Sequence, residues 1–332
     1  MALDALSDVL KTVRLTGAAF YDVVATAPWV AEQPTADRIL PKILPGAGHL
    51  ISYHVVTEGR CFVNRIDEAP IVVEAGEVVV FTRGDPHVVA SDPGMRAEPD
   101  APSAIDAVSV NRLPFLLTIG EPSGSQQAKI VCGFLACDAQ PFNPLLENLP
   151  PVIKVGSTVG NTAGGSDARW LDQFIRLATA ESAEKRAGGE CVLARLSELM
   201  FVEVVRRYLE TLPPEQTGWL AGLRDPGISK ALSLLHGNPA HNWTIEDLAR
   251  DVGLSRSLLA ERFAELVGMP PIQYLAKWRM QLAAGLLSGG NTNIATIAAE
   301  IGYGSEAAFS RAFKKLVGIP PSDWRRRPAT AR

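Results

Sequence analysis

A pattern that recurs 50 residues later constrains the last hundred residues of this chain more than any other feature. The stretch 263–271 reads FAELVGMPP, and the stretch 313–321 reads FKKLVGIPP. Upstream of each, LARDVGLS at 248–255 matches IAAEIGYGS at 297–305, with one extra residue in the second copy. Because self-similarity at a fixed offset is typical of repeated supersecondary units, the sequence predicts that one such unit occurs twice.

Each copy carries the signals of two helices joined by a tight turn. In the first copy Thr244 and Ser255 are good N-caps, and Gly253 between them suits a turn with positive φ. Gly302 and Ser305 occupy the equivalent places in the second copy. Both copies stop at Gly-x-Pro-Pro, which ends a helix. An all-helical bundle with a fortuitous repeat is the alternative, but it does not explain why cap, glycine and stop recur together.

Composition and charge are consistent with a soluble chain of more than one domain. The chain has 332 residues, 47% hydrophobic and 20% charged, which is enough to bury a full core. Residues 1–225 hold 19 Lys/Arg against 28 Asp/Glu, whereas residues 226–332 hold 13 against 8. A basic C-terminal part on an acidic body indicates a polyanionic partner. Without a membrane-length apolar run or a basic leader, we expect a cytoplasmic protein.

The C-terminal part resembles a known family of DNA-binding proteins. Residues 226–327 are similar throughout to the DNA-binding domain of the AraC/XylS family, including GYGSEAAFSRAFKKLVGIPPSDWRR at 302–326. The resemblance implies two helix-turn-helix units joined by a linker helix, here 272–288, with recognition helices in adjacent major grooves. It implies transcription regulation, as an activator, with a double-stranded DNA operator and RNA polymerase as partners.

Base reading requires side chains on the outward face of the second helix of each unit, near its N-terminus. Arg311 can donate two hydrogen bonds to guanine, so we expect it to read a base. Glu261 can accept from cytosine N4, but it can equally be a surface acid paired with Arg256. The predicted DNA contacts are Arg256, Ser257, Glu261 and Arg262 in the first copy, and Glu306, Ser310, Arg311, Lys314 and Lys315 in the second.

Residues 18–155 are typical of a β-barrel or sandwich instead. Short β-rich runs alternate with Gly59, Gly76 and Gly84, and we expect a mobile acidic loop over Ser91–Gln127. The segment 75–87 resembles the second motif of the cupin barrel, which ends in a metal-binding histidine, here His87. The ligands of the first cupin motif would fall near Gly46, Gly48 and Ser52 and are therefore absent, which argues against a cupin enzyme.

A different cluster can form inside the barrel. Strand alternation points His54 inward, the cupin resemblance does the same for His87, and Cys132 lies in a later strand. These three could hold Zn²⁺ or another transition metal, or the thiol could be a redox sensor. The alternative is that the histidines are hydrogen-bonded core residues and that Cys132 is a small buried hydrophobe. Cys61, Cys137 and Cys191 have no feature that separates them from packing residues.

The sequence therefore predicts an α+β multidomain fold. A cupin-like barrel would detect a small molecule or an oxidant, and the helical hairpin after it would mediate homodimerisation or fold back on its own barrel. The rivals are a cupin enzyme with a DNA-binding appendage, and a barrel that is only a dimerisation scaffold. The predicted domains are the barrel (1–165), the hairpin (166–212), a linker (213–225) and the double helix-turn-helix domain (226–332).

Overall fold

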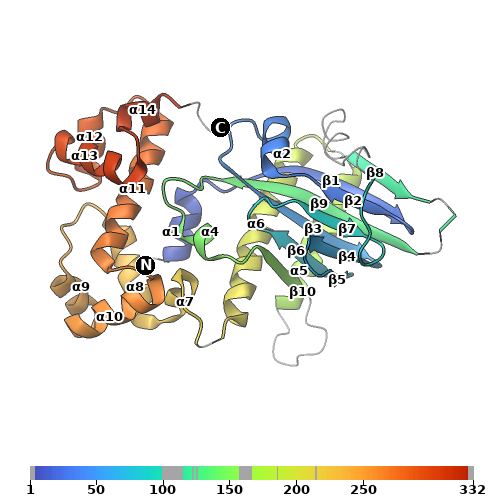
Figure 1. Ribbon diagram of the computed structural model, residues 1–332, viewed down its shortest axis with the longest axis horizontal. Helices are drawn as coiled ribbons and strands as arrows, with labels where there is room; N and C mark the ends of the chain where they lie inside the picture. Colours follow the sequence, from blue (N-terminus) through green and yellow to red (C-terminus); the bar gives the residue numbers. More distant parts are fainter. Residues whose placement is uncertain are drawn as a thin grey trace.

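The computed structural model describes residues 4–98, 115–121, 123–124, 126–156, 167–184, 186–213 and 215–327. In this part of the chain a sheet-rich N-terminal domain lies beside a helical C-terminal domain (Figure 1). Of the acidic loop expected over Ser91–Gln127, residues 99–114, 122 and 125 lie outside the described residues. No helix in the described ranges is both long and apolar enough to cross a membrane.

The N-terminal domain consists of two sheets that pack on a common core. One has six strands in the order β10-β6-β3-β9-β1-β8, and the other has four in the order β2-β7-β4-β5. The strand pairs are antiparallel, apart from the parallel pair β1–β8. The strands are β1 (Thr16–Thr26), β2 (Val30–Gln33), β3 (His49–Glu58), β4 (Arg60–Arg65), β5 (Ile71–Glu74), β6 (Glu77–Phe81), β7 (His87–Ala90), β8 (Phe115–Gly120), β9 (Gln127–Cys137) and β10 (Val152–Gly156).

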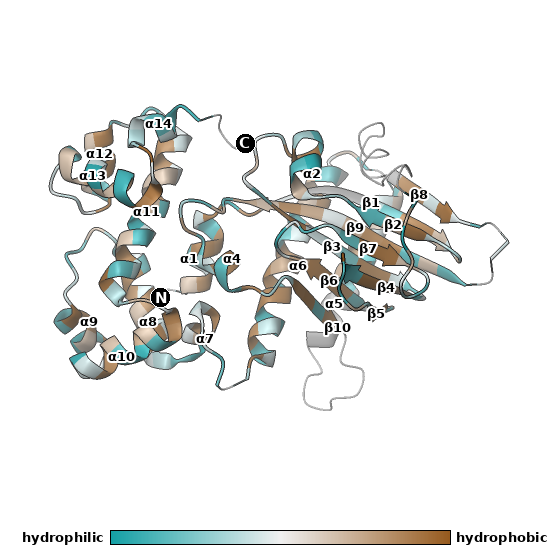
Figure 2. Cartoon of the chain, viewed as in Figure 1, coloured by the Kyte–Doolittle hydropathy of each residue, from teal (hydrophilic) through white to brown (hydrophobic). Residues whose placement is uncertain are grey.

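Helices cover the outer face of the six-stranded sheet. In β3, Tyr53 faces α6 and its hydroxyl contacts the Ser197 hydroxyl at 2.5 Å, while His54 points between the sheets. Figure 2 shows the hydrophobic residues of β3, β6 and β7, which are almost all buried. The helices of this domain are α1 (Ala5–Thr12), α2 (Ala36–Ile43), α4 (Pro144–Asn148), α5 (Asp167–Glu184) and α6 (Gly189–Thr211).

The C-terminal domain follows the repeat closely. Thr244 accepts a hydrogen bond from the Asp247 N–H at 3.1 Å, Ser255 and Ser305 cap the second helices, and Gly253 has φ 78°. The predicted helix starts and stops are therefore confirmed. The helices are α7 (Trp219–Arg224), α8 (Pro226–Gly237), α9 (Ile245–Val252), α10 (Arg256–Val267), α11 (Pro271–Gly289), α12 (Ile294–Glu300), α13 (Glu306–Val317) and α14 (Pro321–Arg325).

The hydrophobic cores do not follow the domain division. One core runs continuously from α1, β3 and α6 into α7–α10 and the first half of α11. A second lies between the two sheets, and a third joins the last half of α11 to α12–α14. The first helix-turn-helix unit thus shares a core with the sheet domain, whereas the second has its own.

Several elements of the N-terminal domain do not appear among the expected ones. The strand β8 lies where the sequence predicts only a loop, and the helix α1 and strands β1, β2 and β10 were not expected either. The partner of β8 is β1, far earlier in the chain, so local alternation gives no sign of this parallel pair. The hairpin α5–α6 forms as predicted, with α6 packed on the barrel.

Candidate DNA-binding surface and effector pocket

The second recognition helix, α13, presents its predicted residues to solvent. Arg311, Lys314, Lys315 and Glu306 are exposed, and Ser310 is half-buried. Phe309 and Phe313 on the opposite face are fully buried and anchor the helix. Among the residues that the structure describes, no ion pair involves Arg311, Lys314 or Lys315. The positive charge of this helix is therefore available to a polyanion.

The first recognition helix, α10, has its arginines already paired. Arg256 contacts Glu246 at 2.9 Å, so its partner is not Glu261, which was the pairing considered from the sequence. Arg262 contacts Asp225 at 2.6 Å, and Asp225 is the N-cap of α8, with only 8% of its side chain exposed. Ser257 and Glu261 are exposed. The predicted contacts of this unit thus include one arginine, Arg262, that already stabilises a neighbouring helix start.

The two units are held together by contacts that sequence reasoning missed. The Arg279 guanidinium, on α11, donates to the carbonyl oxygens of Pro239 at 2.7 Å and His241 at 2.9 Å. Gly302, with φ +83°, lies against the same loop, and a Cβ there would meet the Ala240 carbonyl oxygen at 2.4 Å. The turn glycine was predicted, but its approach to the other unit involves a loop whose sequence gives no signal of it.

The three residues predicted to converge in the barrel do so, but they form a linear series of hydrogen bonds rather than a cluster around one centre. His54 and Cys132 are opposite each other in the β3–β9 ladder, and the His54 Nδ1–Cys132 Sγ distance is 3.0 Å. On its other side, His54 Nε2 lies 2.8 Å from His87 Nε2, and His87 Nδ1 lies 3.0 Å from the Asp85 carbonyl oxygen. His87 also stacks on Phe81, with ring centroids 3.7 Å apart.

The carbonyl group at the end of this series determines the direction of every proton in it. Because a carbonyl oxygen only accepts, His87 donates from Nδ1 and accepts at Nε2 when it is neutral. His54 then donates from Nε2 and accepts at Nδ1, which leaves the Cys132 thiol as the donor to His54. Burial lowers the pKa of His87 to about 4 and that of His54 well below its usual value. The side chains of Cys132, His54 and His87 are therefore all uncharged.

This arrangement fits neither a metal ion held by all three residues nor a Cys132 thiol activated for redox sensing. His54 turns its two ring nitrogens toward different neighbours, so no single ion can be ligated by His54, His87 and Cys132 together. Within the described ranges, no group of three or more His, Cys, Asp or Glu is placed to hold a metal. Burial raises the pKa of the Cys132 thiol well above its usual value, and its neighbour His54 is neutral, so nothing here favours the thiolate that a reactive cysteine needs.

A pocket opens beside these three residues, between β8 at the edge of one sheet and β2 at the edge of the other. Its enclosed part holds only about 30 Å³, and the space with its open mouth included is about 450 Å³. Apolar side chains such as Trp29, Val89 and Ile119 form most of its wall, and His54 and Cys132 also line it. The pocket is thus a small, mainly apolar opening between the side chains of the two sheets.

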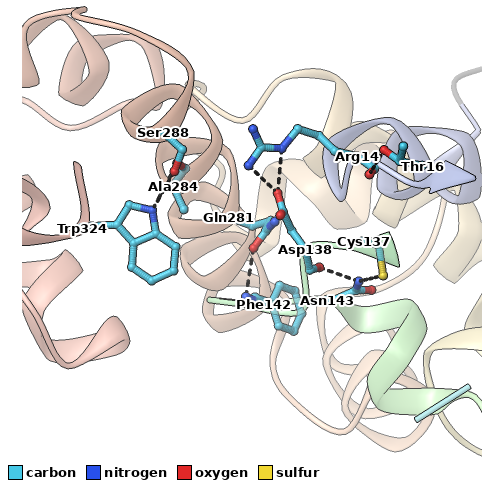
Figure 3. Close-up of polar contacts among 10 residues, drawn as sticks. All are labelled: Arg14, Thr16, Cys137, Asp138, Phe142, Asn143, Gln281, Ala284, Ser288 and Trp324. Atoms are coloured by element: carbon cyan, nitrogen blue, oxygen red, sulfur yellow. Dashed lines mark hydrogen bonds and ion pairs between the residues drawn. The ribbon is translucent and has the colours of Figure 1, made fainter. Parts of the chain in front are cut away.

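The segment that follows the strand carrying Cys132 contacts the C-terminal domain. After β9 ends at Cys137, Asp138 is paired with Arg14 at 2.7 Å, and the Phe142 N–H donates to Gln281 Oε1 at 3.0 Å (Figure 3). Gln281 lies on α11 and is 1% exposed. The Phe142 ring also meets Tyr274 of α11 edge to face. No sequence motif indicated this interface, because its members come from separate elements.

Comparison with known proteins relates both halves of the chain to described families. Residues 4–210 match a family model described as cupin, and residues 248–327 match one described as a helix-turn-helix domain. A putative AraC-like transcription regulator from Streptomyces antibioticus is 33% identical over 98% of this chain and 99% of its own length. The HTH-type transcriptional regulator AlkR from Acinetobacter baylyi is 27% identical over 97% of this chain and 99% of its own. The solved C-terminal domain of AraT, a response regulator from Geobacillus stearothermophilus, is 29% identical over 32% of this chain and 90% of that one, with a TM-score of 0.31.

Proposed function

The chain belongs to the family of AraC-like transcription regulators and is a DNA-binding protein with a cupin-like N-terminal domain. From this premise we propose that a signal received in the barrel pocket changes how the two helix-turn-helix units engage an operator. The observation that carries the proposal is the course of β9, which lines the pocket at Cys132 and leads to the contact between Phe142 and Gln281. A displacement of β9 would reach α11, to which both units are attached. Equal operator affinity with the pocket filled and empty would contradict this.

Arg311 is proposed to read a base in the major groove, and Lys315 to contact phosphate. Arg311→Ala is then expected to cost about 1–3 kcal/mol of operator binding and to relax preference at one base pair. Lys315→Ala should weaken all sequences alike and reduce the salt dependence by about one counterion. Binding titrations against operator variants at several salt concentrations measure both effects, with each substitution serving as the control for the other. Unchanged base preference in Arg311→Ala would refute the assignment.

We propose that both units contact DNA together, on one face. Their recognition helices would then enter major grooves about 34 Å apart, and footprinting would show two protected blocks per domain. A single short block would mean that one unit does not engage. In that case α10 would be the one left out, because Arg256 and Arg262 are already paired within the protein.

The hairpin α5–α6 is proposed to form a homodimer. Leu177, Val192 and Leu199 on it are 59%, 45% and 57% exposed, so three large aliphatic side chains of this hairpin are available to a second copy. Leu199→Glu is expected to shift the sedimentation of the full chain from dimer to monomer. Leu116→Glu, at a residue 61% exposed on β8, is the control that should not. A dimer that survives Leu199→Glu would remove the hairpin from the interface.

The remaining assignments follow from the family and from the site. We propose that the barrel senses a small molecule rather than catalysing a reaction, since Gly46, Gly48 and Ser52 stand where metal-dependent cupins carry ligands. We propose further that the protein works in the cytoplasm and activates transcription through contact with RNA polymerase. Transcription reconstituted from purified polymerase and operator DNA tests the last point, and no stimulation would contradict it.

A further inference from the structure

The wall of the barrel pocket limits the kind of molecule that it can accept. Trp29, Val89, Ile119 and Ile130 give it an apolar surface contributed by both sheets. Filling such a surface stabilises a complex in proportion to the apolar area that leaves water. The body of a ligand must therefore be apolar, which disfavours sugars and other polyhydroxylated molecules.

The charges around the pocket limit the ligand further. Among the described residues that line it, none is a lysine or arginine, and Glu32 is the one carboxylate. Glu32 is already satisfied by Arg96 at 2.5 Å and by the Ala97 N–H at 3.0 Å. An anion would enter without a counter-ion and close to Glu32, and a cation would have to displace Arg96. Either kind of charge is costly to bury there, so the pocket favours a neutral molecule.

One end of the pocket can still form hydrogen bonds. The Gln33 side chain is 9% exposed and donates one amide N–H to the buried Ser52 hydroxyl at 2.5 Å. A primary amide has a second N–H and a carbonyl oxygen, so Gln33 can both donate to and accept from a ligand. The other lining residues His54 and Cys132 already donate their protons to His87 and His54, in the hydrogen-bonded series that ends at the Asp85 carbonyl oxygen. Gln33 therefore has hydrogen-bonding capacity left for an uncharged polar group of a ligand.

We propose that this pocket binds a small, neutral, mainly apolar molecule with a single uncharged hydrogen-bonding group, such as an amide, carbonyl or hydroxyl, which Gln33 recognises. This inference rests on the proposed function, because it assigns the chemistry of the signal that the barrel receives. It places the polar group beside Gln33 and the apolar body between β8 and β2.

The test uses the full chain and three probes of one size, benzamide, benzoate and benzylammonium, which differ mainly in charge. Calorimetric titration at neutral pH is expected to give benzamide an affinity at least about tenfold higher than either ion, since burial of an unpaired charge costs more than this. Gln33→Leu should weaken benzamide while leaving toluene binding in place. Equal or tighter binding of benzoate or benzylammonium would overturn the proposal.

A space-filling variant locates the bound probe. Val89→Phe, at a residue that lines the pocket, should abolish benzamide binding, whereas Val72→Phe, on β5 of the same sheet and 37% exposed, should not. If Val89→Phe does not fold, the Gln33→Leu comparison still decides. Operator binding is measured on the same samples without probe. Benzamide binding that persists in folded Val89→Phe overturns the ligand assignment alone. Failure of the unmodified chain to bind operator DNA would instead overturn the proposed function.

Discussion

Lowering the pH from 7 to 5 is expected to reduce the free energy of unfolding by about 2 kcal/mol for each of two buried histidines, His87 and His236, and buried His54 acts in the same direction. Burial lowers the pKa of His87 to about 4 and of His236 to about 3, and it lowers the pKa of His54 well below its usual value. Each of these side chains titrates near 6.5 in the unfolded chain. Between that pH and the folded pKa, the unfolded chain binds protons that the folded chain does not. The stabilisation is thus complete above about pH 6.5 and is lost as the pH falls toward 4.

Urea denaturation at pH 7, 6 and 5 measures this loss, and a variant with one fewer histidine isolates its cause. His236 stacks on Trp278 with ring centroids 4.0 Å apart, and its Nε2 lies 2.8 Å from the Tyr274 hydroxyl. His236→Gln retains a side chain that can reach this hydroxyl but does not titrate. It should be less stable at pH 7 and should lose about 2 kcal/mol less between pH 7 and 5. Parallel pH profiles for the two proteins would show that His236 is not buried in its neutral form.

Gly302→Ala is expected to weaken operator binding at least about tenfold and to remove the second of the two protected blocks, because a displaced recognition helix loses its base contacts. Two effects act at this position. A residue with a Cβ at positive φ costs about 1–3 kcal/mol. The new Cβ would also lie 2.4 Å from the Ala240 carbonyl oxygen, so the two units must move apart.

Gly253→Ala is the matched control for this substitution. Gly253 occupies the same turn in the first unit with φ +78°, but a Cβ there would meet nothing within 4 Å. It carries the strain of positive φ without the collision. We therefore expect similar losses of stability from the backbone conformation and a much larger change of footprint in Gly302→Ala. Indistinguishable footprints for the two variants would show that the contact with Ala240 does not determine how the units are spaced.

The sequence predicted those features of the fold and the site that depend on residues close to one another in the chain. Caps such as Thr244 and Ser255 bond to residues three positions away, so their patterns can be read directly, and the helices formed as expected. The inward direction of His54 followed from strand alternation, because its neighbours along β3 define the two faces. These predictions needed no knowledge of what lies across the core.

Features that join distant segments could not be predicted in this way. The direction of the protons between Cys132 and His87 depends on the Asp85 carbonyl oxygen, which belongs to the backbone and has no sequence signature. The contact of Gln281 with Phe142 joins two elements that only the tertiary fold brings together. The ion pair of Arg262 with Asp225 likewise changed the surroundings of a residue whose place on α10 was foreseen.

The core shared by α1 and the first helix-turn-helix unit affects how freely this protein can exchange parts with its relatives. Leu6 and Val9 of α1 are buried in the same core as Ile228 and Leu232 of α8. A hybrid that joins residues 226–327 to a foreign sensor would leave this apolar surface of α8 uncovered. Such a hybrid is therefore expected to be more stable when α1 accompanies the DNA-binding part than when it does not.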